Sequence, residues 1–234
     1  MATANTPDKK KRVTLTSPKG ESLFAHVVDV DYGTDKYPDE NGSFNLTLAL
    51  DEEAAATMDA LLEPHVEEAR AVTEERFAAL KPASRKKLGE AKFNDPGPEE
   101  YDKEGDPTGR RLFRFKTAAF FENRQGVKVQ RKVPLFDSMQ QPVKLTEEPG
   151  NGSVMRVAFT PMPYFVDGQG MGGLTLYLNA VQIIKLNRFG ERSAADYGFG
   201  AEEGGFTSGD DMDETTSPKD VAETPAPDDD VPQF

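Results

Sequence analysis

The sequence has 234 residues and carries 28 basic against 41 acidic side chains, which gives a formal net charge of −13. It contains no Cys and only His26 and His65, so disulfides, thiolate metal sites and Cys nucleophiles are excluded, and a zinc site would need carboxylate ligands. No apolar run approaches the roughly 20 residues of a membrane-spanning helix, and residues 1–12 lack the apolar core of a secretory signal. We therefore expect a soluble, intracellular protein with no metal or other cofactor.

The charge is distributed unevenly along the chain. Residues 51–106 carry 8 basic and 16 acidic side chains, residues 107–190 carry 12 and 5, and residues 191–234 carry 2 and 13. Binding of an anion depends on the local potential within about a Debye length of the site. The basic middle segment is therefore able to bind phosphates even though the whole chain is acidic.

Two strand signals lie near the start of the chain. Leu23–Val30 is an apolar and β-branched run, and Phe44–Leu50 alternates apolar with polar residues, as a half-buried strand does. Tyr37–Gly42 is rich in turn-forming residues. We therefore expect two strands joined by a long hairpin loop.

A helical pattern follows these strands. The apolar residues recur at steps of three and four, which predicts a helical region over residues 51–80 with Asp51 as its N-cap. Pro64 allows two interpretations, a kink in one long helix or the first turn of a second helix. Residues 81–109 combine Pro, Gly and mixed charge with little periodicity, which indicates a long loop with short elements.

The second half of the chain is predicted to be β structure. Its four candidate strands are Arg111–Phe121, Val127–Phe136, Ser153–Phe165 and Leu174–Leu186. This order of elements, two strands followed by a helix and then further strands joined by hairpins, predicts a mainly β fold. We expect an OB-fold-like five-stranded barrel with a helical insertion. We expect this domain to span residues 13–190.

The predicted strand from Arg111 interleaves cations with aromatic rings. Its period of two places Arg114 and Lys116 on one face and Phe113 and Phe115 on the other. A core position is the usual one for such Phe residues, and a solvated face is the usual one for such cations. The excess of basic over acidic side chains in residues 107–190 favours a binding function for these cations, because solvated faces normally mix charges of both signs. A basic groove with stacking rings is typical of single-stranded nucleic-acid binding. The candidate residues are Arg114, Lys116, Lys128, Arg131, Lys132, Arg156 and Tyr164.

Both ends of the chain differ in composition from the predicted domain. Residues 1–12 contain the basic cluster Lys9–Arg12, which predicts either a nuclear localisation signal or a flexible arm that contacts phosphates. Residues 191–234 are rich in Gly, Ser, Thr, Pro and acid, and bury too little apolar surface to offset roughly 1–2 kcal/mol per residue of backbone ordering. We expect a disordered acidic tail, in which the large apolar Phe234 has no folding purpose.

Five short stretches occur in a characteristic order along the chain. They are Asp31–Gly33, Phe113–Lys116 with Phe120, Val133–Asp137, Met162–Tyr164 and Arg188–Gly190. Together with the helix between strands and the acid-rich end with Phe234, they make nearly the whole chain resemble the bacteriophage T7-type single-stranded DNA-binding proteins.

The resemblance implies an OB-fold with a helix beside the barrel, a homodimer, and binding of single-stranded DNA without sequence preference. It implies action in phage DNA replication, recombination and repair, in the cytoplasm of the infected bacterial host and without a membrane. Tyr164 matches a stacking residue of the family, whereas Ala118 stands where the family can place Tyr, so Phe120 or Phe121 is the alternative second ring. The tail is implied to bind the phage DNA polymerase and helicase-primase through Asp228, Asp229, Asp230 and Phe234.

Two other classes of protein share some of these features. An acidic DNA mimic or interaction protein would bind a host DNA-binding protein, but a mimic distributes acid over its folded face, and here the acid is segregated. A metal-dependent nuclease would need a recognisable carboxylate motif, and the chain has no P-loop, G-x-S-x-G or H-E-x-x-H motif. We therefore expect a non-enzymatic protein with no catalytic residues.

Overall fold

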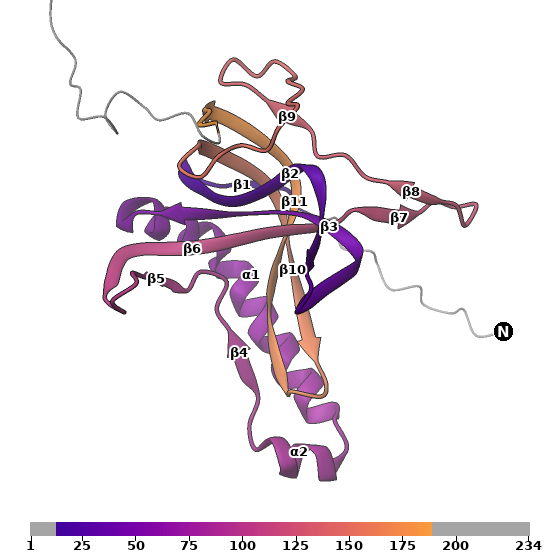
Figure 1. The fold of residues 1–234 in the computed structure, drawn as a ribbon. Helices are drawn as coiled ribbons and strands as arrows, with labels where there is room; N and C mark the ends of the chain where they lie inside the picture. Colours follow the sequence, from indigo (N-terminus) through magenta and orange to yellow (C-terminus); the bar gives the residue numbers. More distant parts are fainter. Residues whose placement is uncertain (1–12, 189–234) are drawn as a thin grey trace, which may run out of the picture. The chain divides into compact units, whose positions relative to one another are not determined.

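Five long strands close into a barrel in the computed structural model, which describes residues 13–188 (Figure 1). They are β2 (Gly20–Thr34), β3 (Tyr37–Leu50), β6 (Pro107–Ala118), β10 (Val154–Val166) and β11 (Met171–Lys185). Around the barrel, β2 pairs with β3, β3 with β6, β6 with β11, β11 with β10, and β10 again with β2. In chain order this ring is 1-2-3-5-4, the arrangement of an OB-fold, so the predicted fold class is confirmed.

Six short strands complete the β structure of the described residues. Four of them pair with barrel strands: β1 (Leu15–Thr16), β4 (Lys92–Asn94), β5 (Glu99–Tyr101) and β9 (Leu135–Phe136). The other two, β7 (Phe120–Glu122) and β8 (Lys128–Gln130), pair with each other and form a ribbon beside the barrel (Figure 1). The predicted basic arm, residues 1–12, and the predicted acidic tail, residues 191–234, lie outside the described residues.

Two predictions about the strands are wrong. The predicted turn Tyr37–Gly42 is the first part of β3, and the chain reverses at residues 35–36, just after Gly33 adopts a left-handed φ of 78°. The predicted strand Val127–Phe136 is not a barrel strand, because only the short β8 and β9 form within it. Pro134 lies between β8 and β9 and cannot donate a hydrogen bond to a neighbouring strand.

The predicted helical region is one continuous helix, α1 (Glu52–Ala79). The Asp51 side chain accepts the N–H of Ala54 at 2.8 Å, which confirms the predicted N-cap. Pro64 lies inside α1 on its exposed side. Proline has no N–H group, so the carbonyl of Ala60, four residues earlier, has no donor within the helix and faces solvent instead. A second short helix, α2 (Pro82–Leu88), follows in the segment predicted as a loop, together with β4 and β5.

Helix α1 packs along the β10–β11 hairpin (Figure 1). Its buried residues are Ala55, Met58, Leu62, Ala69 and Thr73. Thr73 lies so close to Gly172 of β11 that a Cβ atom at position 172 would overlap its side chain. The close approach therefore requires Gly at position 172. Helix α1 covers the face of β11 to which residue 172 points, and residue 173 points to the opposite face.

The barrel interior is filled by aromatic and aliphatic side chains. Phe113 and Phe115 are fully buried, as their spacing predicts, and the intervening Arg114 is exposed. The rings of Phe115 and Phe159 have centroids 5.2 Å apart and planes inclined at 60°, a tilted arrangement that adds to the free energy gained by burial. The period-two pattern of β6 thus separates a packed inner face from a charged outer face.

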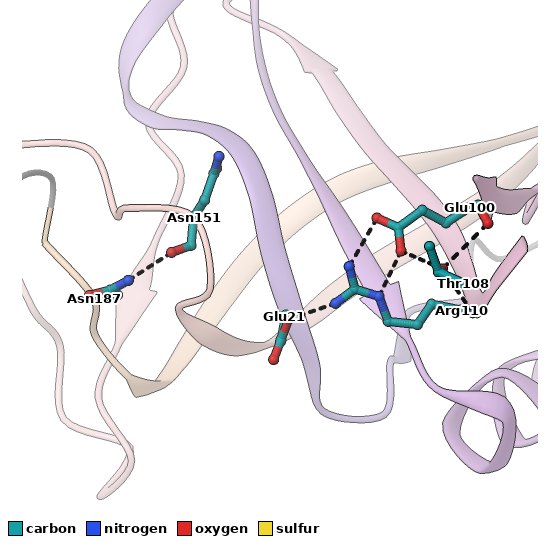
Figure 2. Close-up of polar contacts among 6 residues, drawn as sticks. All are labelled: Glu21, Glu100, Thr108, Arg110, Asn151 and Asn187. Atoms are coloured by element: carbon teal, nitrogen blue, oxygen red, sulfur yellow. Dashed lines mark hydrogen bonds and ion pairs between the residues drawn. The ribbon is translucent and has the colours of Figure 1, made fainter. Parts of the chain in front are cut away.

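The loop before β10 covers an open edge of β2. The Glu148 carboxylate accepts the backbone N–H groups of residues 27–29 at 2.7–3.2 Å. The Asn151 side chain accepts the N–H of Phe24 at 2.8 Å, and the Asn187 side chain donates to the Asn151 carbonyl at 2.8 Å (Figure 2). These side-chain hydrogen bonds satisfy N–H groups of β2 that have no strand partner.

Candidate functional site

The predicted cations of β6 lie on the outer surface of the barrel. Arg114 is opposite Thr47 in the register with β3. Lys116 is opposite Asn45 of β3 and beside Tyr177 of β11, a residue that is 43% exposed. Paired residues of neighbouring strands point to the same face, so these cations share one surface with the Tyr177 ring.

Tyr164 lies on the same surface. It is opposite Gly173 of β11, where a Cβ atom would come within 2.7 Å of the Tyr164 hydroxyl, so the ring lies against the strand only because residue 173 is Gly. Asn94 of β4 donates from Nδ2 to the Tyr164 hydroxyl at 3.3 Å. Residues 173, 175 and 177 alternate to one side, which puts Tyr164 and Tyr177 about 13 Å apart along β11. We call Arg114, Lys116, Tyr164 and Tyr177 the outer-face site.

Acidic residues of the β2–β3 hairpin border the outer-face site. Asp39 forms an ion pair with Lys116 at 3.0 Å, and the hydrogen bond from the ammonium lowers the pKa of the Asp39 carboxyl. Burial raises the pKa of Asp31, but hydrogen bonds from the Gly33 N–H and the Asn45 side chain outweigh burial and lower it. Lys116 can therefore bind a phosphate only if the phosphate displaces the Asp39 carboxylate.

Arg114 has a simpler environment than Lys116. It is exposed and forms no ion pair with any residue between 13 and 188. Its neighbour across the strand pair, Thr47, is uncharged. Arg114 is therefore the cation of the outer-face site that is directly available to an anionic ligand.

The β7–β8 ribbon brings further predicted residues together. The Lys128 ammonium lies 4.6 Å from the Phe120 ring centroid, and the Arg131 guanidinium lies 5.2 Å from that of Phe121. Arg131 also donates from Nε to the Ala118 carbonyl at 3.2 Å. Phe120 packs partly against the core, whereas Phe121 is exposed, so Phe121 is the ring of the pair that is accessible to a ligand. Lys132 follows the ribbon and is also exposed.

Arg156 is separated from the outer-face site. It lies eight residues before Tyr164, about 26 Å along β10, and is paired with Gln182. Around it, Thr16 of β1 and Phe136 of β9 line a shallow groove. The structure therefore does not bring Arg156 and Tyr164 together, so the prediction that both line one groove is not met by their positions on β10.

Two cations of the basic segment, Arg110 and Arg111, form ion pairs within the fold. Arg110 donates to both Glu100 carboxylate oxygens, at 2.7 and 3.0 Å, and to Glu21 at 2.8 Å (Figure 2). The hydrogen bond from Arg110 lowers the pKa of Glu100, and a further one from Thr108 at 2.7 Å lowers it too. Arg111 pairs with Asp59 of α1. These contacts join β2, β5, β6 and α1, and they leave less free positive charge than the sequence count suggests.

Several residues of the surface were missed by sequence reasoning. Tyr177 had a readable signal, because it alternates with Leu176 and Leu178, which are buried. Asn94 and Asp39 had no such signal in the sequence, because their partners, Tyr164 and Lys116, are 70 and 77 residues away in the chain. Between residues 13 and 188 there is no helix long and apolar enough to cross a membrane, nor a group of three or more His, Asp or Glu that could hold a metal ion.

A closed OB-fold barrel that carries cations and accessible rings on its outer face is typical of proteins that bind oligonucleotides. A family model for the single-stranded DNA-binding protein of bacteriophage T7 matches residues 20–186. The chain therefore belongs to this family, and the resemblance seen in the sequence is confirmed.

Individual relatives agree with the family assignment. The chain is 27% identical over 213 residues to the single-stranded DNA-binding protein of Enterobacteria phage T3, covering 85% of this chain and 87% of the relative. The crystal structure of gp2.5, a single-stranded DNA-binding protein encoded by bacteriophage T7, superposes with a TM-score of 0.61 at 21% identity. That superposition covers 85% of this chain and all of the T7 chain, and it supports the same fold.

The Arg110 network predicts an acid-sensitive contribution to stability. Because its pKa is lower in the folded protein, Glu100 stabilises the fold above its unfolded pKa, and this stabilisation is lost as the pH falls through the folded pKa. We expect Glu100→Gln to lower the free energy of unfolding at pH 7 by about 1–2 kcal/mol, and less at pH 3. Urea unfolding at both pH values measures this difference. A loss that is equally large at pH 3, or an equal loss in the exposed control Glu90→Gln, would contradict it.

Proposed function

We propose that this chain binds single-stranded DNA through the outer-face site, without sequence preference, and is not an enzyme. The observation that carries the proposal is the common surface of Tyr164, Arg114 and Lys116 on a closed OB-fold barrel. Bases stack on the rings of Tyr164 and Tyr177, and Arg114 binds phosphate oxygens. Every base has a π-face, so stacking tolerates any sequence. Membership of the family supports this function over the alternative, an acidic DNA mimic.

Binding proceeds by an exchange of anions at Lys116. In the free protein its ammonium is paired with Asp39 at 3.0 Å. A DNA phosphate takes the place of this carboxylate, so the released hairpin residues return to water while Lys116 keeps an anionic partner. Breaking the Asp39–Lys116 ion pair offsets part of the electrostatic free energy gained from the phosphate. Arg114 therefore contributes more to the free energy of binding than Lys116 does.

The β7–β8 ribbon is proposed to extend the contact. Phe121 supplies a third ring, in place of the Tyr that the family can have at position 118, and Lys128, Arg131 and Lys132 supply the cations. Phe120 acts mainly as the packed base of this ribbon, beneath Lys128. Arg156 contacts DNA only where a strand runs along the length of β10.

We further propose that the acidic segment 191–234 recruits the phage DNA polymerase and helicase-primase, with Asp228, Asp229, Asp230 and Phe234 in the contact. The protein acts as a homodimer in replication, recombination and repair, in the cytoplasm of the infected host. The sequence supports an electrostatic function for this segment, because 13 acidic side chains stand against 2 basic ones. It supplies a tethered anion that competes with DNA for basic surfaces.

The central test is a titration of fluorescent single-stranded and double-stranded oligonucleotides at several salt concentrations. We expect preference for the single strand and a slope of log affinity against log salt of about −0.7 per phosphate contact, or roughly −2 to −3.5 for three to five contacts. Arg114→Gln should weaken binding, whereas Asp39→Asn should strengthen it by freeing Lys116. Binding that ignores salt, or that prefers the duplex, would contradict the proposal.

A second expected result concerns stacking. Tyr164→Ala should cost roughly 1–3 kcal/mol of single-strand binding free energy, and Tyr164→Phe should cost much less because the ring is retained. Fluorescence anisotropy measures the affinity, and thermal melting reports folding. Tyr101→Ala removes an exposed ring on β5 and is the matched control. If melting falls sharply while the folded fraction of Tyr164→Ala binds normally, Tyr164 is a core residue instead.

The acidic segment generates a third expected result. Residues 207–234 contain nine acidic side chains and one basic one, Lys219. Truncation after Phe206 should tighten single-strand binding, most at low salt where screening is weakest. Deleting Phe234 alone removes no side-chain charge, so it should leave DNA affinity unchanged and weaken binding to the polymerase or helicase-primase. Equal DNA affinity of the full and truncated chains at low salt would exclude competition by this segment.

A further inference from the structure

A dense group of cations lies on α2 and at the start of β4. Residues 81–92 contain a single acidic side chain, Glu90, against five basic ones. The basic residues are Lys81, Arg85, Lys86, Lys87 and Lys92. All five are exposed, and none forms an ion pair with another described residue. We call these five residues the α2 cluster.

Packing does not explain the cations of α2. The helix has no buried residue, and its half-buried Leu88 lies next to Gly170 at the turn of the β10–β11 hairpin. Cations in the last turn complement the helix dipole, but Lys81 is the N-cap residue, at the end of the helix where the dipole disfavours a cation. Lys81 and Arg85 lie four residues apart with no acidic side chain between them, and like charges at this spacing destabilise a helix. The α2 cluster is thus an unusually one-signed surface.

Strand β4 connects the α2 cluster to the outer-face site. Asn94 donates to the Tyr164 hydroxyl at 3.3 Å, and Lys92 points to the same side of β4 because it lies two residues earlier. Lys92 is paired with Met171, next to the β10–β11 turn. Figure 1 shows β4 following α2, and β4 pairs with the start of β11. The Tyr164 ring, Lys92 and α2 therefore follow one another along a single edge of the molecule.

We propose that the α2 cluster is a second phosphate-binding surface, which takes up the single strand where it leaves the outer-face site beyond Tyr164. This inference rests on the proposed function. Residues 81–92 contain no aromatic side chain, so the cluster holds the sugar-phosphate backbone and does not stack bases. It lengthens the stretch of DNA bound by one protein molecule and adds a contribution that depends strongly on salt and not on sequence.

Two triple variants with the same change in net charge test this surface. Arg85→Gln, Lys86→Gln and Lys87→Gln remove three cations of the α2 cluster. Lys19→Gln, Lys144→Gln and Lys185→Gln remove three exposed cations near the opposite end of the β10–β11 hairpin, where Leu145, the neighbour of Lys144, lies beside Leu186. Each protein is titrated with oligonucleotides of about 5 and about 15 nucleotides, which lie near the short and the long end of the usual range for one OB-fold.

The α2 variant should bind the long oligonucleotide roughly ten-fold more weakly at low salt, with a salt slope shallower by about 2, and should bind the short one normally. The control variant should resemble the wild type. Equal losses in both triple variants would overturn the proposal, since net charge alone would then explain them. If α2 has no effect while Tyr164→Ala still weakens binding, only the α2 proposal fails. If the wild type binds no single strand, both proposals fail.

Discussion

Strand β11 pairs with β10 along its whole length, with β6 at its centre, and with β4 and β9 near its two ends. Closure of the barrel depends on the parallel pairing with β6, which joins the two halves of the chain. The pairing places Phe115 inside against Phe159, and therefore places Lys116 outside beside Tyr177. One register thus sets both the packed core and the alignment of the outer-face site, because a slip by one residue would exchange the two faces.

The electrostatics of the surface depend on which cations have partners. Arg110 and Arg111 hold β6 to β2, β5 and α1, so their charge serves the fold. Lys116 is paired with Asp39, whereas Arg114 and the α2 cluster have no ion pair among the described residues. A protein with a net charge of −13 can therefore still present locally basic surfaces, because screening limits each field to about a Debye length.

The α2 cluster illustrates how averaging hides such a surface. It lies within residues 51–106, which carry 16 acidic and 8 basic side chains, and most of those acids belong to α1 and the β5 region. Folding separates the acids of the β5 region from α2, since α2 sits at the turn of the β10–β11 hairpin and β5 pairs with the start of β6. A count over a shorter window, residues 81–92, would have revealed the cluster without any structure.

Local chemistry determined much of this protein in advance. Period-two alternation predicted the inward Phe113 and Phe115 and the outward Arg114, and Asp51 with the spacing of apolar residues predicted α1, because these patterns depend only on near neighbours. The sequence also carried the family resemblance. Tertiary structure alone decided the Asp39–Lys116 pair, the Asn94–Tyr164 contact and the position of Tyr177 beside Lys116. Each of these depends on register between distant strands, which barrel closure sets and which no local pattern encodes.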